Sequence, residues 1–503
     1  MKLSSTHAVV IGAGFGGLSA ALTLATQGVR VTVIEAADHT GGKASQSSWE
    51  GVKFDTGPSL LTMTEVLERL CALAQTSMEE QITLRPLSPA FRYIYPDGVE
   101  LDTHHAPEAT LASVRAVLGP QAEADLAGFL DYARQIWNAA APPFVFGNAP
   151  SLRQLMSMRW STLAGLRHID AASTMVGAIQ RRVRSPHLQT LLARYATYNG
   201  SDVRHAPATL NCIAHVELTL GGYGVDGGLY HVAQTLTELA RAAGAEFRLG
   251  TRVTDVLTQR NRVTGVQLAT GERCHADVVV SNADVQHLFN DLMPSTLQDP
   301  GPPEAPSMSG WNAVIRRTRR PGRAPHTVLF PENYLAEFEA IFDHRQVPEE
   351  PTIYLCDQAA THNRSGWSDA DPLFVMINAP AVHHGGSLAE HDWEAVQAQV
   401  VERITHAGLM EATDPVVWTR TPQQLAERFP GSKGSLYGAA SNSMWSAFLR
   451  PANRANQVEG LYLASGTVHP GGGVPMCMLS GMAASRAALT DLGFGQLSQQ
   501  IAV

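Results

Sequence analysis

Three glycines near the N-terminus have the spacing of a phosphate-binding turn. Gly12, Gly14 and Gly17 form G-x-G-x-x-G between an apolar run and a segment rich in small residues. In such a turn the first glycine permits a tight bend, the second lets the backbone approach a pyrophosphate, and the third lets helix and strand pack closely. The N–H groups and the dipole at the start of the following helix favour a negative charge. The spacing therefore predicts a nucleotide site, not glycines that serve packing alone.

An acidic residue follows at the distance expected for ribose recognition. Glu35 ends the second apolar run, VRVTVIE, about 20 residues beyond the glycines. A carboxylate at this point accepts both hydroxyls of an adenosine ribose and disfavours a 2′-phosphate. Strand, turn, helix and acid together predict a dinucleotide-binding unit.

A second glycine-rich stretch lies near the C-terminus. HPGGGVP (469–475) follows a predicted strand, Leu461–Ala464, and precedes a helix expected to start near Pro475. A loop and helix N-terminus of this kind stabilise negative charge that builds on an adjacent ring. His469 has two interpretations, a catalytic base or a residue that only packs or caps, since the proline after it holds it extended.

The elements that position these residues belong to a chain of 503 residues, long enough for two intertwined domains. A net charge of −9 argues against a nucleic-acid partner. The five cysteines are scattered and never spaced as CxxC, which predicts free thiols in a reducing compartment and no metal site. No stretch offers the roughly 20 apolar residues that span a bilayer, and no secretory leader is visible. We expect a cytoplasmic protein, peripherally associated with the inner membrane.

The motifs resemble those of the carotenoid desaturases, a family of FAD-dependent oxidoreductases. GGK (41–43) resembles the GG-[RK] extension of two-dinucleotide-binding flavoproteins, which separates FAD from NAD as the cofactor. FDTGPSLLT (54–62) by itself predicts only a turn, but it looks like the flavin-side segment of this family. Three further stretches resemble sequence of the same family: RYATYNGSDVRHAPATLNCIAHVEL (194–218), GSLYGAASNSMWSAFLRPANR (434–454) and HPGGGVP, the last resembling its C-terminal flavin signature. The resemblance covers residue 8 to about residue 490 and implies an α/β, Rossmann-type, amine oxidase-like flavoprotein with an inserted mixed-sheet and helical substrate domain.

The resemblance also implies how the chain is divided and which residues touch FAD. The FAD-binding domain comprises residues 1–70, 221–287 and 426–503, and the substrate domain comprises residues 71–220 and 288–425. In the substrate domain, FRYIYPDGVELDT predicts a hairpin that turns at residues 96–98, and we expect a mixed sheet with helices on one face. By resemblance, Val253 lies against the adenine and Asn282 closes a strand near the cofactor. The full set of expected cofactor-binding residues is Gly12, Gly14, Phe15, Gly16, Gly17, Glu35, Ala36, Gly41, Gly42, Lys43, Thr56, Gly57, Pro58, Ser59, Val253, Asn282, Gly466, Thr467, Gly473, Val474, Pro475 and Met476.

The resemblance implies an activity as well. A methionine after GVP and the HVE element favour the 1-hydroxycarotenoid 3,4-desaturase (methoxyneurosporene dehydrogenase) branch. Removing hydrogens from adjacent allylic carbons needs a hydride acceptor, which the flavin supplies, so no catalytic triad is required. The catalytic base stays unassigned. The expected tunnel residues, each equally compatible with a core position, are Tyr195, Tyr198, His215, Trp445 and Phe448.

Several alternatives remain open. Phytoene desaturase, a carotenoid isomerase and a carotenoid oxygenase share the family, and product mass separates them. A non-catalytic isoprenoid-carrier protein of the same fold predicts no flavin absorbance. An amine oxidase fits the C-terminal loop poorly, because Ser465, Gly466 and Thr467 stand where many superfamily members place an acid.

One segment bears on the membrane. Residues 141–168 mix aromatic and aliphatic side chains with three arginines and contain no acid. Such a segment is typical of a helix lying in an anionic membrane surface, and equally of a helix docked on its own protein. The expected partner is a carotenoid substrate delivered from the membrane; no feature of the sequence indicates an oligomeric state.

Overall fold

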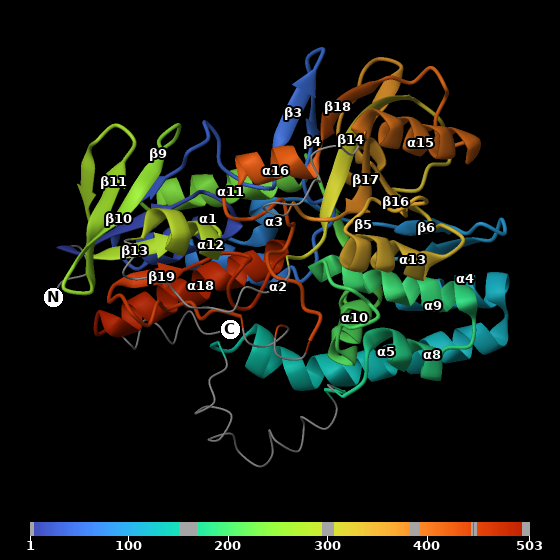
Figure 1. Ribbon diagram of the computed structural model, residues 1–503, viewed down its shortest axis with the longest axis horizontal. Helices are drawn as coiled ribbons and strands as arrows, with labels where there is room; N and C mark the ends of the chain where they lie inside the picture. The colour runs from blue at the N-terminus through green and yellow to red at the C-terminus, as the bar shows by residue number, and fades with distance from the viewer. Residues whose placement is uncertain are drawn as a thin grey trace.

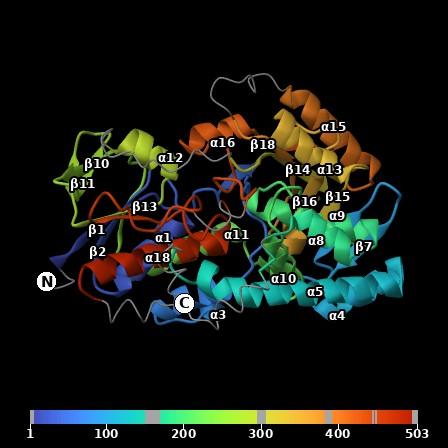
Figure 2. The ribbon, with the colours of Figure 1, turned by 60° about the horizontal axis from the view of Figure 1, so that its bottom comes forward.

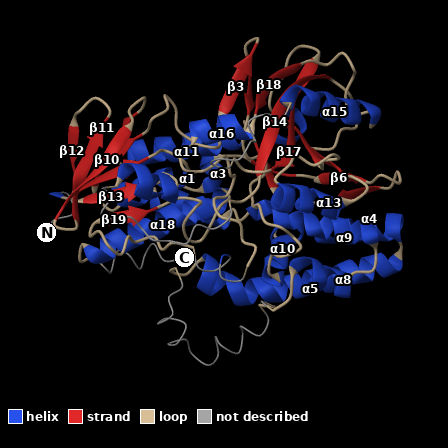
Figure 3. Cartoon of the chain, in the orientation of Figure 1, coloured by secondary structure: helices blue, strands red, loops and turns tan. Residues whose placement is uncertain are grey.

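The protein, seen here as a computed structural model, consists of two lobes that share a long interface (Figure 1). The structure describes residues 5–149, 169–170, 172–293, 306–382, 392–443, 446 and 450–494. One lobe contains a parallel sheet and the other a larger mixed sheet, and the chain passes between them several times. Figure 3 shows both sheets in red, with helices around each.

The first lobe has a five-stranded parallel sheet that collects strands from distant parts of the chain. Its order is β19-β13-β1-β2-β9, and every neighbouring pair is parallel. The strands are β1 (His7–Ile11), β2 (Arg30–Ile34), β9 (Glu246–Arg248), β13 (Val278–Ser281) and β19 (Leu461–Leu463). β1 and β13 are buried throughout and mostly apolar because a parallel sheet is covered on both faces.

Helices cover one face of this sheet and a small antiparallel sheet covers the other. Ala8 and Val10 of β1 pack into the helical core, whereas Val9 and Ile11 pack toward the three-stranded sheet. The helices of the first layer are α1 (Phe15–Thr26), α2 (Glu65–Leu73), α11 (Leu229–Ala242) and α18 (Val474–Asp491). The strands of the third layer are β10 (Val253–Gln259), β11 (Arg262–Leu268) and β12 (Arg273–His275). The alternation of side chains along β1 therefore separates two cores.

The second lobe is built on a seven-stranded sheet of order β18-β14-β17-β16-β15-β6-β7. All its pairs are antiparallel except β15 with β6. The hairpin predicted to turn at residues 96–98 is confirmed, since β6 pairs with β7. The strands are β6 (Phe91–Ile94), β7 (Glu100–Thr103), β14 (Ser309–Thr318), β15 (His326–Leu329), β16 (Ile353–Asp357), β17 (Ala370–Ala379) and β18 (Val416–Arg420).

Helices pack on both faces of the mixed sheet, so the expectation of helices on one face is wrong. Leu355 and Val375 face α15 (Trp393–His406), while Tyr93 and Val328 face the opposite core with α5 (Pro120–Ala140), α8 (Met175–Arg182) and α9 (Pro186–Ala193). Figure 2 shows α15 and α5 on opposite sides of the strands. The strands are apolar on both faces, a pattern that does not reveal which face carries helices.

The remaining elements are mostly short. The short strands are β3 (Gln46–Trp49), β4 (Val52–Asp55), β5 (Leu84–Pro86) and β8 (Tyr223–Val225). The other helices are α3 (Met78–Gln81), α4 (Pro107–Leu118), α10 (Cys212–Leu218), α12 (Val285–His287), α13 (Tyr334–Phe338), α14 (Gln358–His362) and α16 (Pro422–Arg428), with π-helical or 3-10 turns at Ala141–Val145, Arg194–Asn199, Ala208–Asn211, Leu288–Leu292 and Glu339–His344. In the part of the chain that the structure describes, no helix has both the length and the apolar character needed to cross a bilayer.

Candidate active site

A cavity of about 860 Å³ begins where the parallel strands end and continues into the second lobe. Its first part is lined by the carboxyl ends of β1, β2 and β13, where ligands bind in sheets of this kind. Its second part is lined by one face of the mixed sheet, including Val328, Tyr354 and Met376. A single space therefore joins the predicted dinucleotide site to the second lobe.

The glycine turn is held by contacts that no larger residue permits. Gly12 has a φ of +90°, a conformation that glycine adopts without strain. A Cβ on Gly16 would lie 2.1 Å from the carbonyl oxygen of Ala464, and a Cβ on Gly17 would lie 2.0 Å from the carbonyl oxygen of Gly12. The start of α1 is thereby fixed against the end of β19.

Asn282 ties the three FAD-binding segments together. Its Oδ1 accepts a hydrogen bond of 3.0 Å from the Gly14 N–H, and its Nδ2 donates to the carbonyl of Ala464. Gly41, also within residues 1–70, is joined to the glycine turn, because its N–H donates to the Ala13 carbonyl at 2.8 Å. The cradle is thus built by residues far apart in sequence but adjacent at the carboxyl edge of the sheet.

The Glu35 carboxylate is fixed at the end of β2. One oxygen accepts a 2.7 Å hydrogen bond from the Ala13 N–H and the other a 2.8 Å bond from the Ala37 N–H. Each carboxylate oxygen has a second lone pair, so the group can still accept ribose hydroxyls. Because Glu35 lines the cavity, its position suits adenosine recognition.

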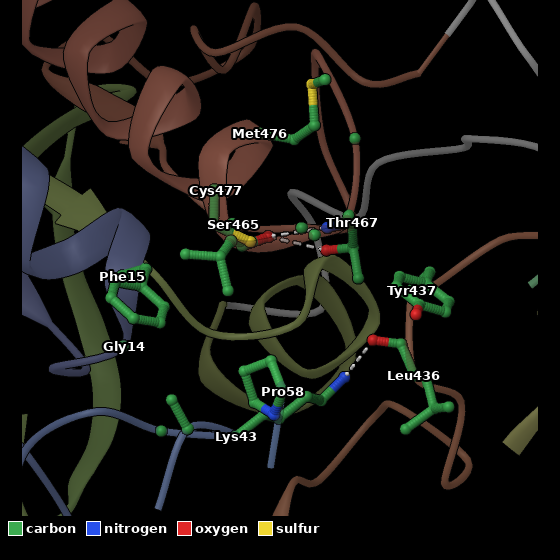
Figure 4. Close-up of a pocket in the computed structure, with 18 of the residues that line it drawn as sticks. Gly14, Phe15, Lys43, Pro58, Leu436, Tyr437, Ser465, Thr467, Met476 and Cys477 are labelled. Carbon is green, nitrogen blue, oxygen red and sulfur yellow. Dashed lines mark hydrogen bonds between the residues drawn. The ribbon is translucent and has the colours of Figure 1, made fainter. Parts of the chain in front are cut away.

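The C-terminal loop closes the other side of the cavity (Figure 4). Gly473, with a φ of +108°, precedes α18, and Val474, Pro475 and Met476 form the first turn of this helix in the cavity wall. The helix start brings a partial positive charge to the site. Ser465 and Thr467 are joined by a 2.8 Å hydrogen bond between their hydroxyls, which stiffens the loop behind them.

Two cations line the same space. The Lys43 ammonium donates to the carbonyls of Ser435 and Leu436 at 2.9 and 3.0 Å, and burial lowers its pKa. Arg420, at the end of β18, donates to the Thr56 carbonyl at 2.6 Å, whereas its Nε and Nη1 have no partner among the described residues. Burial lowers the pKa of Arg420 to about 10.

The residues present fit FAD. A buried guanidinium with two unpartnered nitrogens costs free energy unless an anion or acceptor occupies the adjacent space. The glycine cradle leaves room for a diphosphate against backbone, and Glu35 supplies the ribose acceptor. Arg420 with its two unpartnered nitrogens, the glycine cradle and the Glu35 carboxylate all lie along one cavity. This is the arrangement that an anionic dinucleotide requires.

Comparisons with known proteins agree. Residues 15–489 match the family described as flavin containing amine oxidoreductase. The chain is 33% identical to hydroxyneurosporene desaturase of Rubrivivax gelatinosus over 100% of its own length and 96% of that protein. It is 29% identical to 4,4′-diaponeurosporene oxygenase of Staphylococcus aureus (strain MSSA476), over 94% of this chain and 96% of that one.

A solved structure supports the fold. Cyclohexylamine oxidase from Brevibacterium oxydans superposes with a TM-score of 0.60 over 97% of this chain and 99% of that chain, at 15% identity. The fold and the cleft define a dinucleotide-binding flavoprotein of the predicted α/β class. The chain belongs to the flavin containing amine oxidoreductase family and, within it, to the carotenoid desaturase-like FAD oxidoreductases. It is an enzyme, and its cofactor is FAD.

The structure brings most of the predicted cofactor residues to the cavity wall. Of the predicted set, Gly17 and Thr56 do not line it. Gly17 acts by packing against Gly12, and Thr56 is buried behind the wall, where its hydroxyl bonds Ser45. The residues that line the cavity are Gly12, Gly14, Phe15, Gly16, Glu35, Ala36, Gly41, Gly42, Lys43, Gly57, Pro58, Ser59, Val253, Asn282, Gly466, Thr467, Gly473, Val474, Pro475 and Met476.

The predicted tunnel residues separate into three groups. Tyr198 lines the cavity. Tyr195 and His215 are buried outside its wall, Tyr195 because it faces the core of the second lobe and His215 because α10 turns its apolar face, Ile213 and Val216, to the cavity. Trp445 and Phe448 lie outside the described residues.

His469 lines the cavity but is held by backbone. Its Nε2 lies 3.1 Å from the carbonyl oxygen of Gly147, and burial lowers its pKa to about 4. An imidazole that donates to a carbonyl through one nitrogen and has so low a pKa is a weak base. The geometry favours the packing interpretation, in which His469 fixes the segment after α5 against the flavin loop.

The buried histidines make the fold acid-sensitive. The pKa of His469 is about 4 and that of buried His362 about 3, both below the usual 6.5 because of burial. Each contributes stability that is present above pH 6.5 and is lost as the pH falls toward its folded-state pKa. For His469 alone, we expect a loss of about 2 kcal/mol in the free energy of unfolding between pH 7 and pH 5.

Thermal or urea unfolding of the wild type and His469→Gln at both pH values measures this loss. The variant keeps an N–H for the Gly147 carbonyl, so its fold should be preserved. Because glutamine has no titratable ring, the variant should lose less stability on acidification than the wild type. His406→Gln, at an exposed position of α15, is the control and should behave as the wild type. Equal acid sensitivity of the wild type and His469→Gln would show that His469 is not a source of the acid-dependent loss of stability.

The described part of the segment 141–168 packs on the protein. Phe144 and Val145, in a π-helical turn, line the cavity, and the ring of Phe146 lies edge-on to Trp137 with 6.2 Å between centroids. The residues from 150 to 168, which include all three arginines, lie outside the described residues.

Within the described ranges, no three His, Cys, Asp or Glu side chains are arranged to hold a metal ion. The prediction of free thiols is confirmed, because Cys71, Cys212, Cys274, Cys356 and Cys477 are all unpaired by disulfides.

Sequence reasoning missed several residues of the cavity. Arg420, Arg194, Glu217 and Tyr334 line it from the second lobe. Single charged or hydroxyl-bearing residues in strands and helices normally face water, so no pattern singled them out. Only Arg194 and Glu217 fall within a family-like stretch, 194–218, where Glu217 belongs to the HVE element; Arg420 and Tyr334 lie outside every such stretch.

Proposed function

We propose that the protein is an FAD-dependent desaturase of acyclic carotenoids that acts at the 3,4 bond of a 1-hydroxy or 1-methoxy substrate. The observation that carries the proposal is the continuous cavity, which runs from the FAD cradle across an apolar sheet face. The similarity to hydroxyneurosporene desaturase over the whole chain supports the substrate class.

The chain's own residues position the substrate and exclude water. FAD, when bound, supplies an acceptor for a hydride from an allylic carbon. Val328, Phe374 and Met376 provide a flat apolar wall on the sheet side, and Ile213 and Val216 of α10 provide another. Such walls hold one C–C bond of the substrate near the flavin site and exclude water from the site of reaction.

A direct link joins the flavin side to this wall. Ser59, in the predicted flavin-side segment, is hydrogen-bonded through its hydroxyl to Tyr354 of β16 at 2.5 Å. Tyr354 is bonded in turn to Nδ1 of His326 at 2.8 Å. These hydrogen bonds fix the distance between the cofactor segment and the substrate wall. A fixed distance is needed to orient a C–C bond of the substrate for hydride transfer.

Apolar burial alone does not select the substrate. A carotenoid leaves a lipid environment, so moving it into an apolar cavity gains little free energy. Discrimination between related carotenoids then depends on cavity length and on polar groups, because an unpaired buried polar group costs about 1–3 kcal/mol. For the same reason we propose that the protein collects its substrate at a membrane, as a peripheral protein of the cytoplasmic side.

A second candidate is oxygenation of a terminal group, because 4,4′-diaponeurosporene oxygenase is also a relative over nearly the whole chain. The same cavity and cofactor serve both reactions, and the products differ in mass. An isomerase of the same family would give a product of unchanged mass.

Expression in cells that accumulate a single acyclic carotenoid separates these candidates. With a 1-hydroxylated carotenoid we expect a product about two mass units lighter, with a red-shifted absorption maximum, because each dehydrogenation removes two hydrogens and extends the conjugation. Mass spectrometry and the absorption spectrum measure the outcome. A gain of oxygen would favour the second candidate. Equal activity on phytoene would contradict the assignment to the 1-hydroxycarotenoid 3,4-desaturase branch.

A further inference from the structure

A buried ion pair surrounded by tyrosines forms part of the cavity wall in the second lobe. Arg194 Nη2 donates to Glu217 Oε1 at 3.1 Å and to the Tyr93 hydroxyl at 2.9 Å. The Tyr195 hydroxyl donates to the same carboxylate oxygen at 2.8 Å, and the Tyr198 hydroxyl donates to Glu217 Oε2. We call these five residues the Arg194–Glu217 cluster.

The cluster has an inner side and a cavity side. Arg194, Tyr198 and Glu217 line the cavity, while Tyr93 and Tyr195, both 0% exposed, support them from the core. Burying an ion pair is costly unless further hydrogen bonds satisfy both partners. The tyrosines supply such bonds to both partners, and Arg194 Nε alone of the guanidinium nitrogens is buried without a partner among the described residues.

Tyr334 of α13 adds an unused hydroxyl beside the cluster. Tyr334 lines the cavity and is only 5% exposed, yet its hydroxyl has no hydrogen-bond partner among the described residues. Arg194 lies close enough to act electrostatically on Tyr334, Tyr198 and Tyr354 alike. A buried hydroxyl without a partner, on a residue of the cavity wall, is expected where a ligand supplies the missing partner.

We propose that the Arg194–Glu217 cluster and Tyr334 bind the hydroxyl group at the end of the carotenoid substrate. This inference rests on the proposed function and names the part of the cavity that selects the substrate. A hydroxyl both donates and accepts, so it can donate to the Glu217 carboxylate and accept from Tyr334. A methoxy group only accepts, and a hydrocarbon end does neither.

The expected selectivity follows from this difference. A site built to hydrogen-bond a hydroxyl rejects the analogue that lacks it, because its buried polar groups are then left unpaired. We therefore expect preference in the order hydroxyl, methoxy, hydrocarbon. The probes are an acyclic 1-hydroxycarotenoid and its counterpart without the hydroxyl, both in detergent micelles.

The test is Tyr334→Phe in the FAD-loaded enzyme. Removing a hydroxyl that has no partner in the protein should leave the melting temperature within about 2 °C of the wild type. We expect kcat/KM and binding of the hydroxylated probe to fall about tenfold or more, with little change for the hydrocarbon probe. Binding is followed by quenching of tryptophan fluorescence, which needs no turnover.

Tyr95→Phe is the matched control. Tyr95 is also buried and packs against Phe330, as Tyr334 does, but its hydroxyl donates to the His187 carbonyl at 2.8 Å and it does not line the cavity. This variant should lose stability and keep the preference for the hydroxylated probe. Glu217 is not substituted, because removing the carboxylate would leave Arg194 buried without a counter-charge.

The outcomes separate this inference from the proposed function. If Tyr334→Phe weakens both probes equally, or if the wild type binds both equally, the assignment of the cluster is wrong and the desaturase proposal is untouched. If the wild type prefers the hydroxylated probe in binding but dehydrogenates neither, the proposed reaction is wrong and the binding site stands.

Discussion

Gly16→Ala is expected to give a colourless protein that retains no FAD and unfolds at a markedly lower temperature. The added Cβ would lie 2.1 Å from the Ala464 carbonyl oxygen and 2.7 Å from Asn282 Nδ2. Neither neighbour is free to move, since Ala464 donates its N–H to Ser281 and Asn282 holds Gly14. Relief requires α1 to separate from β19, which opens the cradle where the three FAD-binding segments meet.

Flavin absorbance of the purified protein and thermal unfolding measure this effect. Forced overpacking of a well-packed site costs about 1–3 kcal/mol or more, and here it also displaces the backbone that faces the cofactor. Gly128→Ala is the control, because Gly128 lies in α5 with nothing within 4 Å of an added Cβ. That variant should keep its flavin and gain up to about 1 kcal/mol of stability. A yellow, fully stable Gly16→Ala protein would contradict the described packing.

Arg420→Met is expected to weaken FAD binding by about 100-fold while raising the stability of the apoprotein. The guanidinium is buried and donates one hydrogen bond, to Thr56, with Nε and Nη1 unpartnered. Without the cofactor, such a charge opposes folding, so an apolar side chain of similar length is favourable. With the cofactor, a charge-assisted hydrogen bond contributes about 1.5–3 kcal/mol, which the variant loses.

The two effects have opposite signs, which makes the experiment selective. Titration of dialysed apoprotein with FAD, followed by flavin fluorescence, gives the affinity, and unfolding of the apoprotein gives the stability. Arg273→Met, at an exposed position of β12, should change neither. If Arg420→Met lowers apoprotein stability and leaves FAD affinity unchanged, then Arg420 is a structural residue of β18 and not part of the cofactor site.

The main features of the FAD-binding half of this protein can be predicted from its sequence. The glycine turn, Glu35 and the HPGGGVP loop are recognisable because each depends on local backbone geometry, which a few adjacent residues impose. Gly12 and Gly473 both have a positive φ, a local requirement that favours glycine, and Gly473 directly precedes a helix. The β6–β7 hairpin was predictable for the same reason. Gly17 was placed at the cofactor by its motif, although its role is to pack against Gly12.

Which side chains of the second lobe line the cavity could not be predicted, because it depends on how distant segments pack. Tyr195 and Tyr198 lie three positions apart, yet one supports Glu217 from the core and the other lines the cavity. Arg420, Glu217 and Tyr334 come from three elements that meet only after folding. Burial of a polar side chain is a property of the packed assembly, not of its neighbours in sequence, because the partners that stabilise it are contributed by distant segments.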